Sequence, residues 1–261
     1  MKIYFAGYTT IPEIVTETEA DNFLESFLYF RKKDYGKWHQ EQGYLGKNLF
    51  LDSGAYSAFS RGEKIDLDEY IEFIKNNKQH IKTYAGLDVI GDWQATRKNI
   101  EYMEAHGLQP LPTFHVGSPL TELHRLCDKY DYIALGGLVP LATQRVKMES
   151  WLNTCFSVIK DYWPVKVHGF GVNSFWSWKK YPFYSVDATS WLAGMKFRQV
   201  VLFKDGKLIQ KNKQKEENDL WKMKVHESSY RELNLTNARS YMEAADFVTR
   251  VWEQRGIKFT D

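Results

Sequence analysis

The segment Leu49-Phe50-Leu51-Asp52-Ser53-Gly54-Ala55-Tyr56 joins a short apolar run to an acid and a turn of small residues. Such a run is typical of a parallel strand that is buried on both faces, and it presents a carboxylate where the strand ends. The segment from Tyr184 to Thr189 repeats the pattern around Asp187, and Ala134-Leu135-Gly136-Gly137-Leu138 ends in a glycine pair. Two carboxylates could supply a nucleophile and a proton acceptor, and a Gly-Gly turn lets a flat ligand approach backbone amides. The combination indicates chemistry on a nucleobase or a sugar.

Similar apolar runs recur along the chain and alternate with helical patterns. They predict eight strands, at residues 3–7, 49–53, 83–88, 111–116, 132–136, 165–169, 183–187 and 199–203. Helices are expected at residues 19–33, 66–76, 94–105, 119–129 and 143–160. Eight strands alternating with helices predict an α/β fold of the TIM-type (β/α)8 barrel, with an open doubly wound sheet as the alternative.

The end of the chain predicts an appendage to this barrel. Lys204-Asp205-Gly206-Lys207 carries an Asp-Gly hairpin signal, so residues 199–203 could instead pair with 208–210. A charged stretch at 211–217 is expected to be a solvated loop, and a final helix is expected at about 236–255. We therefore expect a single domain over 1–261, with the barrel at about 1–203 and a C-terminal hairpin, charged loop and helix at about 204–261.

Composition excludes several classes of protein. The net charge of +2 gives no general attraction for nucleic acid, so any such contact needs a local basic surface. Cys127 and Cys155 form neither a disulfide framework nor a zinc subdomain, and two separate thiols fit a reducing cytosol. The polar N-terminus is unlike a signal peptide, and no stretch approaches the ~20 apolar residues of a membrane span. We expect a cytoplasmic protein with no membrane partner.

In a barrel, the active site lies at the carboxyl ends of the strands. The side chains and turns expected there are Asp52, Asp88, Asp187, His115, His168 and Gly136-Gly137. Asp and His at strand ends could bind a metal in a barrel hydrolase, although the chain has no HxH or HExxH motif. The other interpretation is an ionised Asp that attacks an anomeric carbon while a second carboxylate handles the proton, which needs no metal.

These motifs resemble those of the tRNA-guanine transglycosylase superfamily, most closely its phage and bacterial DNA branch, the DpdA-like enzymes. The matching segments, in the family's order over roughly residues 48–192, are Asp52-Ser53-Gly54-Ala55-Tyr56, Gly86-Leu87-Asp88, Pro112-Thr113-Phe114-His115-Val116-Gly117, Ala134-Leu135-Gly136-Gly137-Leu138, His168-Gly169-Phe170-Gly171 and Ser185-Val186-Asp187-Ala188-Thr189. The family has a second glycine where this chain has Ala55, a change that should be tolerated if the φ of Ala55 is negative.

The resemblance implies a TIM-type barrel and a base-exchange reaction, in which guanine leaves a polynucleotide and a 7-deazaguanine such as preQ0 enters. It implies that Asp187 is the nucleophile at C1′ and that Asp52 is the general base or acid for the incoming base. Asp88 would accept hydrogen bonds from N1–H and the exocyclic amine, which suits an ionised carboxylate because it only accepts. The base is a co-substrate, and neither a cofactor nor a metal is implied.

The resemblance also implies the remaining walls of a base pocket. The backbone of Gly136, Gly137 and Leu138 would face the O6 and C7 side of the base, and Ser53 would contribute a hydrogen bond. The tRNA enzymes carry a Gln-Gly pair where this chain has His115-Val116-Gly117. We assign His115 to recognition of O6.

A target base must leave the stack to reach such a pocket. The aromatic candidates for stacking on it are Tyr56, Trp93, Trp176, Trp178 and Trp191. The basic candidates for phosphate contacts are Arg61, Lys64, Arg97, Lys179, Lys180 and Arg198.

The leading hypothesis is a guanine transglycosylase that acts on DNA, because the Cys-rich zinc subdomain of the tRNA enzymes is missing. The same reaction on tRNA is the first alternative. A non-catalytic nucleic-acid-binding subunit and a metal-dependent barrel hydrolase are two others. The expected partners are DNA, a free 7-deazaguanine base and either a helper protein or a second copy of the chain, in a bacterial cell and with a phage as a candidate source.

Overall fold

The computed structural model describes residues 1–43, 46–212 and 229–259. The chain divides into two compact units, Met1–Phe23 with Val172–Asp261 and Leu24–Gly171. Most of the expected charged loop, residues 213–217, lies outside the described residues. Among the residues that are described, no helix is both long and apolar enough to cross a membrane.

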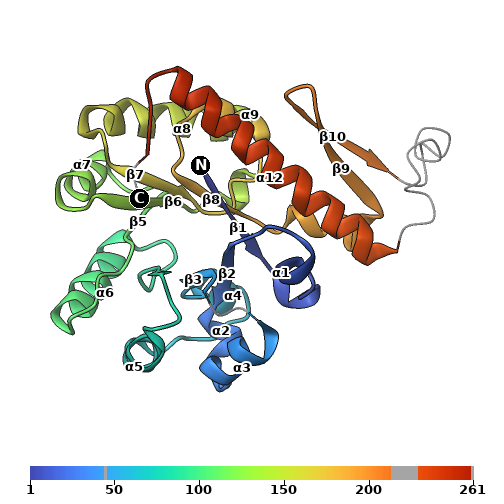
Figure 1. The fold of residues 1–261 in the computed structure, drawn as a ribbon. Helices are drawn as coiled ribbons and strands as arrows, with labels where there is room; N and C mark the ends of the chain where they lie inside the picture. The colour runs from blue at the N-terminus through green and yellow to red at the C-terminus, as the bar shows by residue number, and fades with distance from the viewer. Residues whose placement is uncertain (44–45, 213–228, 260–261) are drawn as a thin grey trace. The chain divides into compact units, whose positions relative to one another are not determined.

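Eight strands form one sheet with the order β4-β3-β2-β1-β8-β7-β6-β5. The strands are β1 (Lys2–Ala6), β2 (Asn22–Ser26), β3 (Asn48–Asp52), β4 (Thr83–Tyr84), β5 (Thr113–His115), β6 (Tyr132–Gly136), β7 (Lys166–Gly169) and β8 (Ser185–Ala188). The pairs β1–β8, β3–β4, β5–β6 and β6–β7 are parallel. With its helices, this sheet makes an α/β fold like that of a TIM barrel (Figure 1).

The second unit, Leu24–Gly171, also joins the segments next to β4 and β5, the two ends of that order. Ala85 forms a parallel bridge with Leu111. The Leu111 amide donates to the Tyr84 carbonyl at 2.8 Å, and the Gly86 amide donates to the Leu111 carbonyl at 3.0 Å. A (β/α)8 barrel requires a contact of this kind between its end strands.

Most of the expected helices of the second unit are confirmed to within one or two residues. They are α5 (Leu67–Asn77), α6 (Trp93–Ala105), α7 (Leu120–Lys129) and α8 (Arg145–Ile159), which are preceded by the shorter α2 (Phe27–Phe30), α3 (Tyr35–Gln42) and α4 (Ala55–Ser60). The Asp66 carboxylate accepts a hydrogen bond from the Glu69 amide at the start of α5, and Asp92 accepts one from the Ala95 amide at the start of α6. These acids satisfy backbone donors that a helix start leaves open.

The expected helix at 19–33 is wrong, because β2 and the short α2 occupy this stretch. Along β2, Phe23 and Glu25 are buried while their neighbours are partly exposed, which is the period of a strand. Glu25 is a buried acid, and its carboxylate binds the Tyr35 hydroxyl and, at 2.8 Å, Nε2 of His39. Because the buried Glu25 is polar, the sequence of β2 lacks the alternation of apolar and polar residues that is expected of a strand. The apolar residues around Glu25 fit the pattern of a helix instead.

The hairpin alternative is confirmed for the first unit. β9 (Gln199–Lys204) pairs with β10 (Lys207–Asn212) in a separate antiparallel sheet, so residues 199–203 do not supply the eighth strand of the large sheet. That strand is β2. Asp205 and Gly206 have φ values of 52° and 68°, as a two-residue type I′ turn requires.

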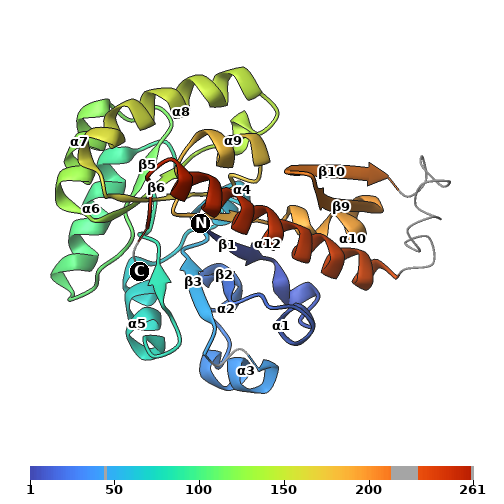
Figure 2. The ribbon, with the colours of Figure 1, turned by 45° about the horizontal axis from the view of Figure 1, so that its top comes forward.

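A long helix, α12 (Tyr230–Gln254), lies beside the hairpin within the first unit (Figure 2). It begins six residues before the expected start of 236, at a capping box formed by Ser229 and Glu232. Its Asn237 accepts a hydrogen bond from the Val201 amide at 2.6 Å and donates to the Gln199 carbonyl at 3.3 Å. The Asn237 side chain thereby supplies hydrogen-bond partners to two backbone groups at the edge of β9.

Candidate functional site

The second unit carries most of the sequence-predicted site residues where its strands end. Asp52 is the last residue of β3, His115 of β5 and Gly136 of β6, and Asp88 follows four residues after β4. The carboxyl ends of parallel strands lie along one edge of a sheet, which is where barrel enzymes place their active sites.

Asp88 and His115 form a direct pair at this edge. Oδ2 of Asp88 lies 3.1 Å from Nε2 of His115, and the two side chains are only 15% and 19% exposed. The other carboxylate oxygen, Oδ1 of Asp88, is buried and has no hydrogen-bond partner among the described residues. Oδ1 of Asp88 is therefore a buried acceptor that could take a hydrogen bond from a ligand.

Two opposing effects set the pKa of His115. Burial lowers the pKa, because it disfavours the charged imidazolium, while the charge and the hydrogen bond of Asp88 raise it. The net result is a pKa above the ordinary 6.5. Asp88 thus favours a protonated His115, which donates from Nε2.

The glycine turn lies directly against His115. A Cβ on Gly136 would stand 2.6 Å from Cγ2 of Thr113 and 3.3 Å from Cδ2 of His115. Gly137 has a φ of +75°, which L side chains rarely adopt. Leu138, which follows, is buried. Both glycines are needed for the close approach of this turn to the histidine.

Asp52 and Ser53 shape the turn after β3. Oδ2 of Asp52 accepts a hydrogen bond from the Gly54 amide at 3.0 Å. Ser53 is buried, and its hydroxyl accepts from the Ala55 amide at 3.4 Å. Ala55 is the first residue of α4 and has a negative φ, so this position does not require a glycine.

Tyr70 of α5 is a further residue of this region, and the sequence did not indicate it as part of a site. It is fully buried, and its hydroxyl donates to the Ala85 carbonyl at 2.8 Å. Burial raises the pKa of Tyr70 most, and the charges of Asp52 and Asp88 raise it further. Both carboxylates therefore lie within electrostatic reach of one hydroxyl. The sequence places Tyr70 only on the apolar face of a helix, which predicts core packing.

Helix α6 holds the segment that carries Asp88. Nδ2 of Asn99 donates to the Leu87 carbonyl at 2.9 Å, and the Thr96 hydroxyl accepts from the Val89 amide at 2.8 Å. A Cβ on Gly86 would stand 1.9 Å from Cδ1 of Ile100, so glycine is required where the segment crosses the helix. The backbone on both sides of Asp88 is thus fixed.

Asp187 belongs to the other unit and is described within it. It lies on β8 opposite Tyr4 of β1 and is partly buried. The following Trp191 donates from Nε1 to the Ala6 carbonyl at 2.9 Å, which ties the residues after Asp187 to the end of β1.

Two of the aromatic candidates for stacking on a base are buried in this structure. Trp191 is completely buried, and its ring meets that of Phe5 edge to face at 5.8 Å, so it is a core residue. Trp178 is likewise buried. His168, expected at the rim, is also buried, and its ring packs against Phe50 and Phe170.

The other candidate nucleic-acid contacts have mixed surroundings. Tyr56 is 48% exposed, and Arg61 is exposed and donates to the Tyr29 hydroxyl at 2.8 Å. Trp93 is partly buried beneath the guanidinium of Arg97, which pairs with Glu122.

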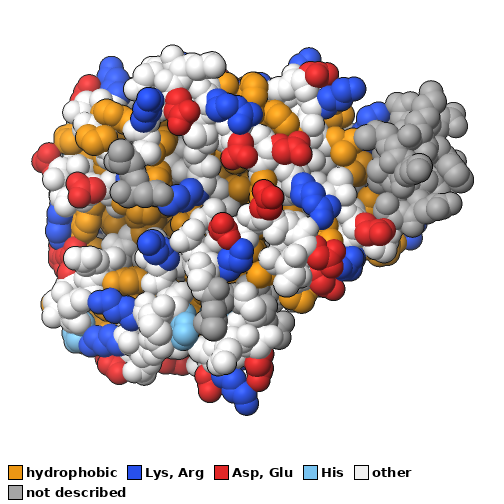
Figure 3. Space-filling model, viewed as in Figure 1, with side chains coloured by type: hydrophobic (Ala, Val, Ile, Leu, Met, Phe, Trp, Pro, Cys, Tyr) orange, Lys and Arg blue, Asp and Glu red, His pale blue; other side chains and the backbone are white. Residues whose placement is uncertain are grey.

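In the first unit, Lys179 lies over the Phe175 ring and Lys180 is exposed. On the face shown in Figure 3, basic and acidic side chains are interspersed. The described side chains on that face therefore form no broad basic surface.

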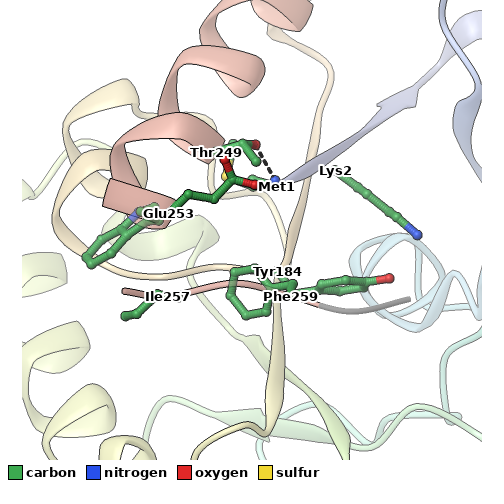
Figure 4. Close-up of a pocket in the computed structure, with 8 residues that line it drawn as sticks. Met1, Lys2, Tyr184, Thr249, Glu253, Ile257 and Phe259 are labelled. Atoms are coloured by element: carbon green, nitrogen blue, oxygen red, sulfur yellow. Dashed lines mark hydrogen bonds between the residues drawn. The ribbon is translucent and has the colours of Figure 1, made fainter. Parts of the chain in front are cut away.

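A cavity of about 110 Å³ lies in the first unit. It is lined by Met1, Lys2, Tyr184, Thr249, Trp252, Glu253, Ile257 and Phe259 (Figure 4). Met1, Lys2 and Tyr184 are at the amino ends of β1 and β8, so the cavity lies at the opposite end of these strands from Asp187. It contains none of the predicted site residues.

The described part of the chain contains no group of three or more His, Cys, Asp or Glu side chains that could hold a metal ion. Comparison with known proteins found no family model and no curated protein that matches the chain.

Proposed function

We propose that the protein is a guanine transglycosylase with a (β/α)8 barrel, which exchanges guanine in DNA for a 7-deazaguanine such as preQ0. The observation that carries the proposal is the Asp88–His115 pair, which lies against the Gly136 turn and leaves Oδ1 of Asp88 buried without a partner among the described residues. The order of the sequence motifs supplies the roles of the other residues.

The proposed reaction has two displacements at C1′ of the target nucleotide. A carboxylate oxygen of Asp187 forms a bond to C1′ as the bond from C1′ to N9 of guanine breaks, and a protonated Asp52 donates its proton to N9 of the departing guanine. Asp52 then takes the N9 proton of the incoming base, and N9 displaces Asp187 from C1′. One base replaces another, and neither water nor a redox partner is consumed.

The pocket supplies recognition of the guanine-like edge. Oδ1 of Asp88 accepts from N1–H or the exocyclic amine, and the bond to His115 fixes the orientation of the carboxylate. In the proposed complex the backbone of Gly136 and Gly137 faces the base, at a turn where a side chain on Gly136 would clash with Thr113. A base that lacks these donors leaves a buried acceptor unpaired, which is a strong basis for rejection.

The test is incorporation of labelled preQ0 or guanine into DNA and, in parallel, into tRNA. We expect label in DNA, and a loss of at least ~10³-fold in the variant Asp187→Asn, because an amide is a poor nucleophile. Asp161→Asn, the same change at an exposed acid of the second unit, should retain activity. Thermal unfolding of each variant checks that it is folded.

The possible outcomes separate the hypotheses. Label in tRNA alone keeps the mechanism and replaces the substrate. Label that is still incorporated by Asp187→Asn would show that Asp187 is not the nucleophile. No label in either polynucleotide, from folded wild-type protein, contradicts the proposed activity.

A further inference from the structure

The β9–β10 hairpin presents a face with three lysines. Successive side chains on a strand alternate between faces, so the register places Val200, Leu202, Lys204, Lys207, Ile209 and Lys211 together. We call this set the lysine face. It has no acidic residue.

Packing fixes which part of the ribbon is covered. On the opposite face, the ring of Phe203 contacts those of Phe175 at 5.8 Å and Phe247 at 5.5 Å. On the lysine face, the cover supplied by the described residues lies at the base, where Val200 and Leu202 pack with Leu233 of α12. The tip of the lysine face is therefore the exposed part.

The exposed tip concentrates positive charge. Lys204 and Lys207 stand directly opposite each other across the strands, and both are exposed. Like charges in such a pair destabilise a hairpin. Asp205 lies between them in the turn, yet among the described residues no acid forms an ion pair with either lysine. Ile209, next to them on the same face, is 37% exposed.

The ribbon is also held in place. Asn237 binds backbone groups of β9, and Gly206 of the turn packs so closely on Phe247 that a Cβ would stand 3.1 Å from its ring. The turn that carries the two lysines is thus held by contacts with α12.

We propose that the lysine face binds the phosphate backbone of a polynucleotide, through Lys204 and Lys207. A repelling pair of lysines is complementary to a row of phosphates, which would offset the repulsion. A two-stranded ribbon is also narrow enough to enter a nucleic-acid groove. The choice of a polynucleotide over other polyanions rests on the proposed function, and the inference extends that function by naming a substrate-binding surface distant in sequence from the base pocket.

The test measures binding of a short fluorescent DNA duplex and of tRNA at several salt concentrations. It uses the variant Asp187→Asn, so that no turnover occurs. Adding Lys204→Gln and Lys207→Gln should weaken binding and lower the slope of log K against log salt by about 2, one for each phosphate contact. The matched control is Lys37→Gln with Lys75→Gln, which removes the same charge from exposed lysines of α3 and α5. The control should leave the slope unchanged.

An equal loss in both double variants would show that net charge alone matters and would overturn the inference. So would an unchanged slope in the hairpin variant, or no binding to either polynucleotide at low salt. The proposed function is tested separately. If the wild type exchanges bases but the hairpin variant has an unchanged salt slope, the proposed function stands and the role of the lysine face is wrong. If binding depends on the two lysines but no base exchange occurs, the role of the lysine face stands and the proposed function is wrong.

Discussion

At the residue scale, the contact between Asp88 and His115 makes a prediction about protonation. In wild-type protein, Asp88 overcomes the effect of burial and raises the pKa of His115. In Asp88→Asn only burial remains, so the pKa of His115 should fall below its ordinary 6.5. An NMR titration of the ring measures this directly, with His106, an exposed histidine, as the internal control.

The sign of the stability effect follows from the same shift. A raised pKa in the folded state means that this contribution to the free energy of unfolding is fully present below pH 6.5 and is lost as the pH rises through the pKa of the folded protein. A His115 titration that does not move in Asp88→Asn would contradict the pairing.

The same residues show what sequence can and cannot predict about a site. An Asp or a Gly-Gly pair after an apolar run is visible in the sequence, and Asp52, Asp88 and Gly136 do lie at or just after strand ends. The bond from Asp88 to His115 is not visible, because it depends on how two strands and a four-residue segment are placed in space. Tyr70 is equally hidden, since a tyrosine on the apolar face of a helix normally indicates core.

At the element scale, β2 is a segment for which the spacing of apolar residues in the sequence predicts the wrong secondary structure. Helices with a cap, such as α5 after Asp66, were predictable because a local interaction marks their start. β2 has no such mark, because its buried Glu25 interrupts the apolar alternation and is stabilised by Tyr35 and His39 of the later helix α3. Contacts with another part of the chain, rather than a local signal, therefore determine that this segment is a strand.

Glu25→Ala should therefore lower the free energy of unfolding by about 1–3 kcal/mol for each buried group that loses its partner, because the Tyr35 hydroxyl and Nε2 of His39 both lose the carboxylate they bind. The side chains of Glu25 and His39 are both fully buried, so nothing replaces the lost carboxylate. Glu25→Gln should cost less, because an amide oxygen still accepts from Tyr35. Denaturant unfolding measures both. A loss within about 0.5 kcal/mol, as at an exposed helix position, would contradict the strand assignment.

At the scale of the whole molecule, the chain order of the two units predicts how they unfold. The first unit is built from both ends of the chain, so if the second unit unfolded alone it would become one long closed loop, at an entropic cost. We expect a single cooperative transition. Cys127 and Cys155 report on the second unit, because both are buried and burial raises the pKa of each thiol, that of Cys127 to about 12. Thiolates react and protonated thiols do not, so labelling in native protein should be negligible near neutral pH.

The measurement is thiol labelling by a pulse of reagent across a denaturant series, compared with far-UV circular dichroism of the whole chain. The two midpoints should coincide, as two-state unfolding requires. The single variants Cys127→Ala and Cys155→Ala assign the signal to each thiol, and both should give the same midpoint because α7 and α8 pack together. Labelling at a lower denaturant concentration than the loss of ellipticity would mean that the second unit opens by itself, and the two units would then have to be treated as separately stable parts.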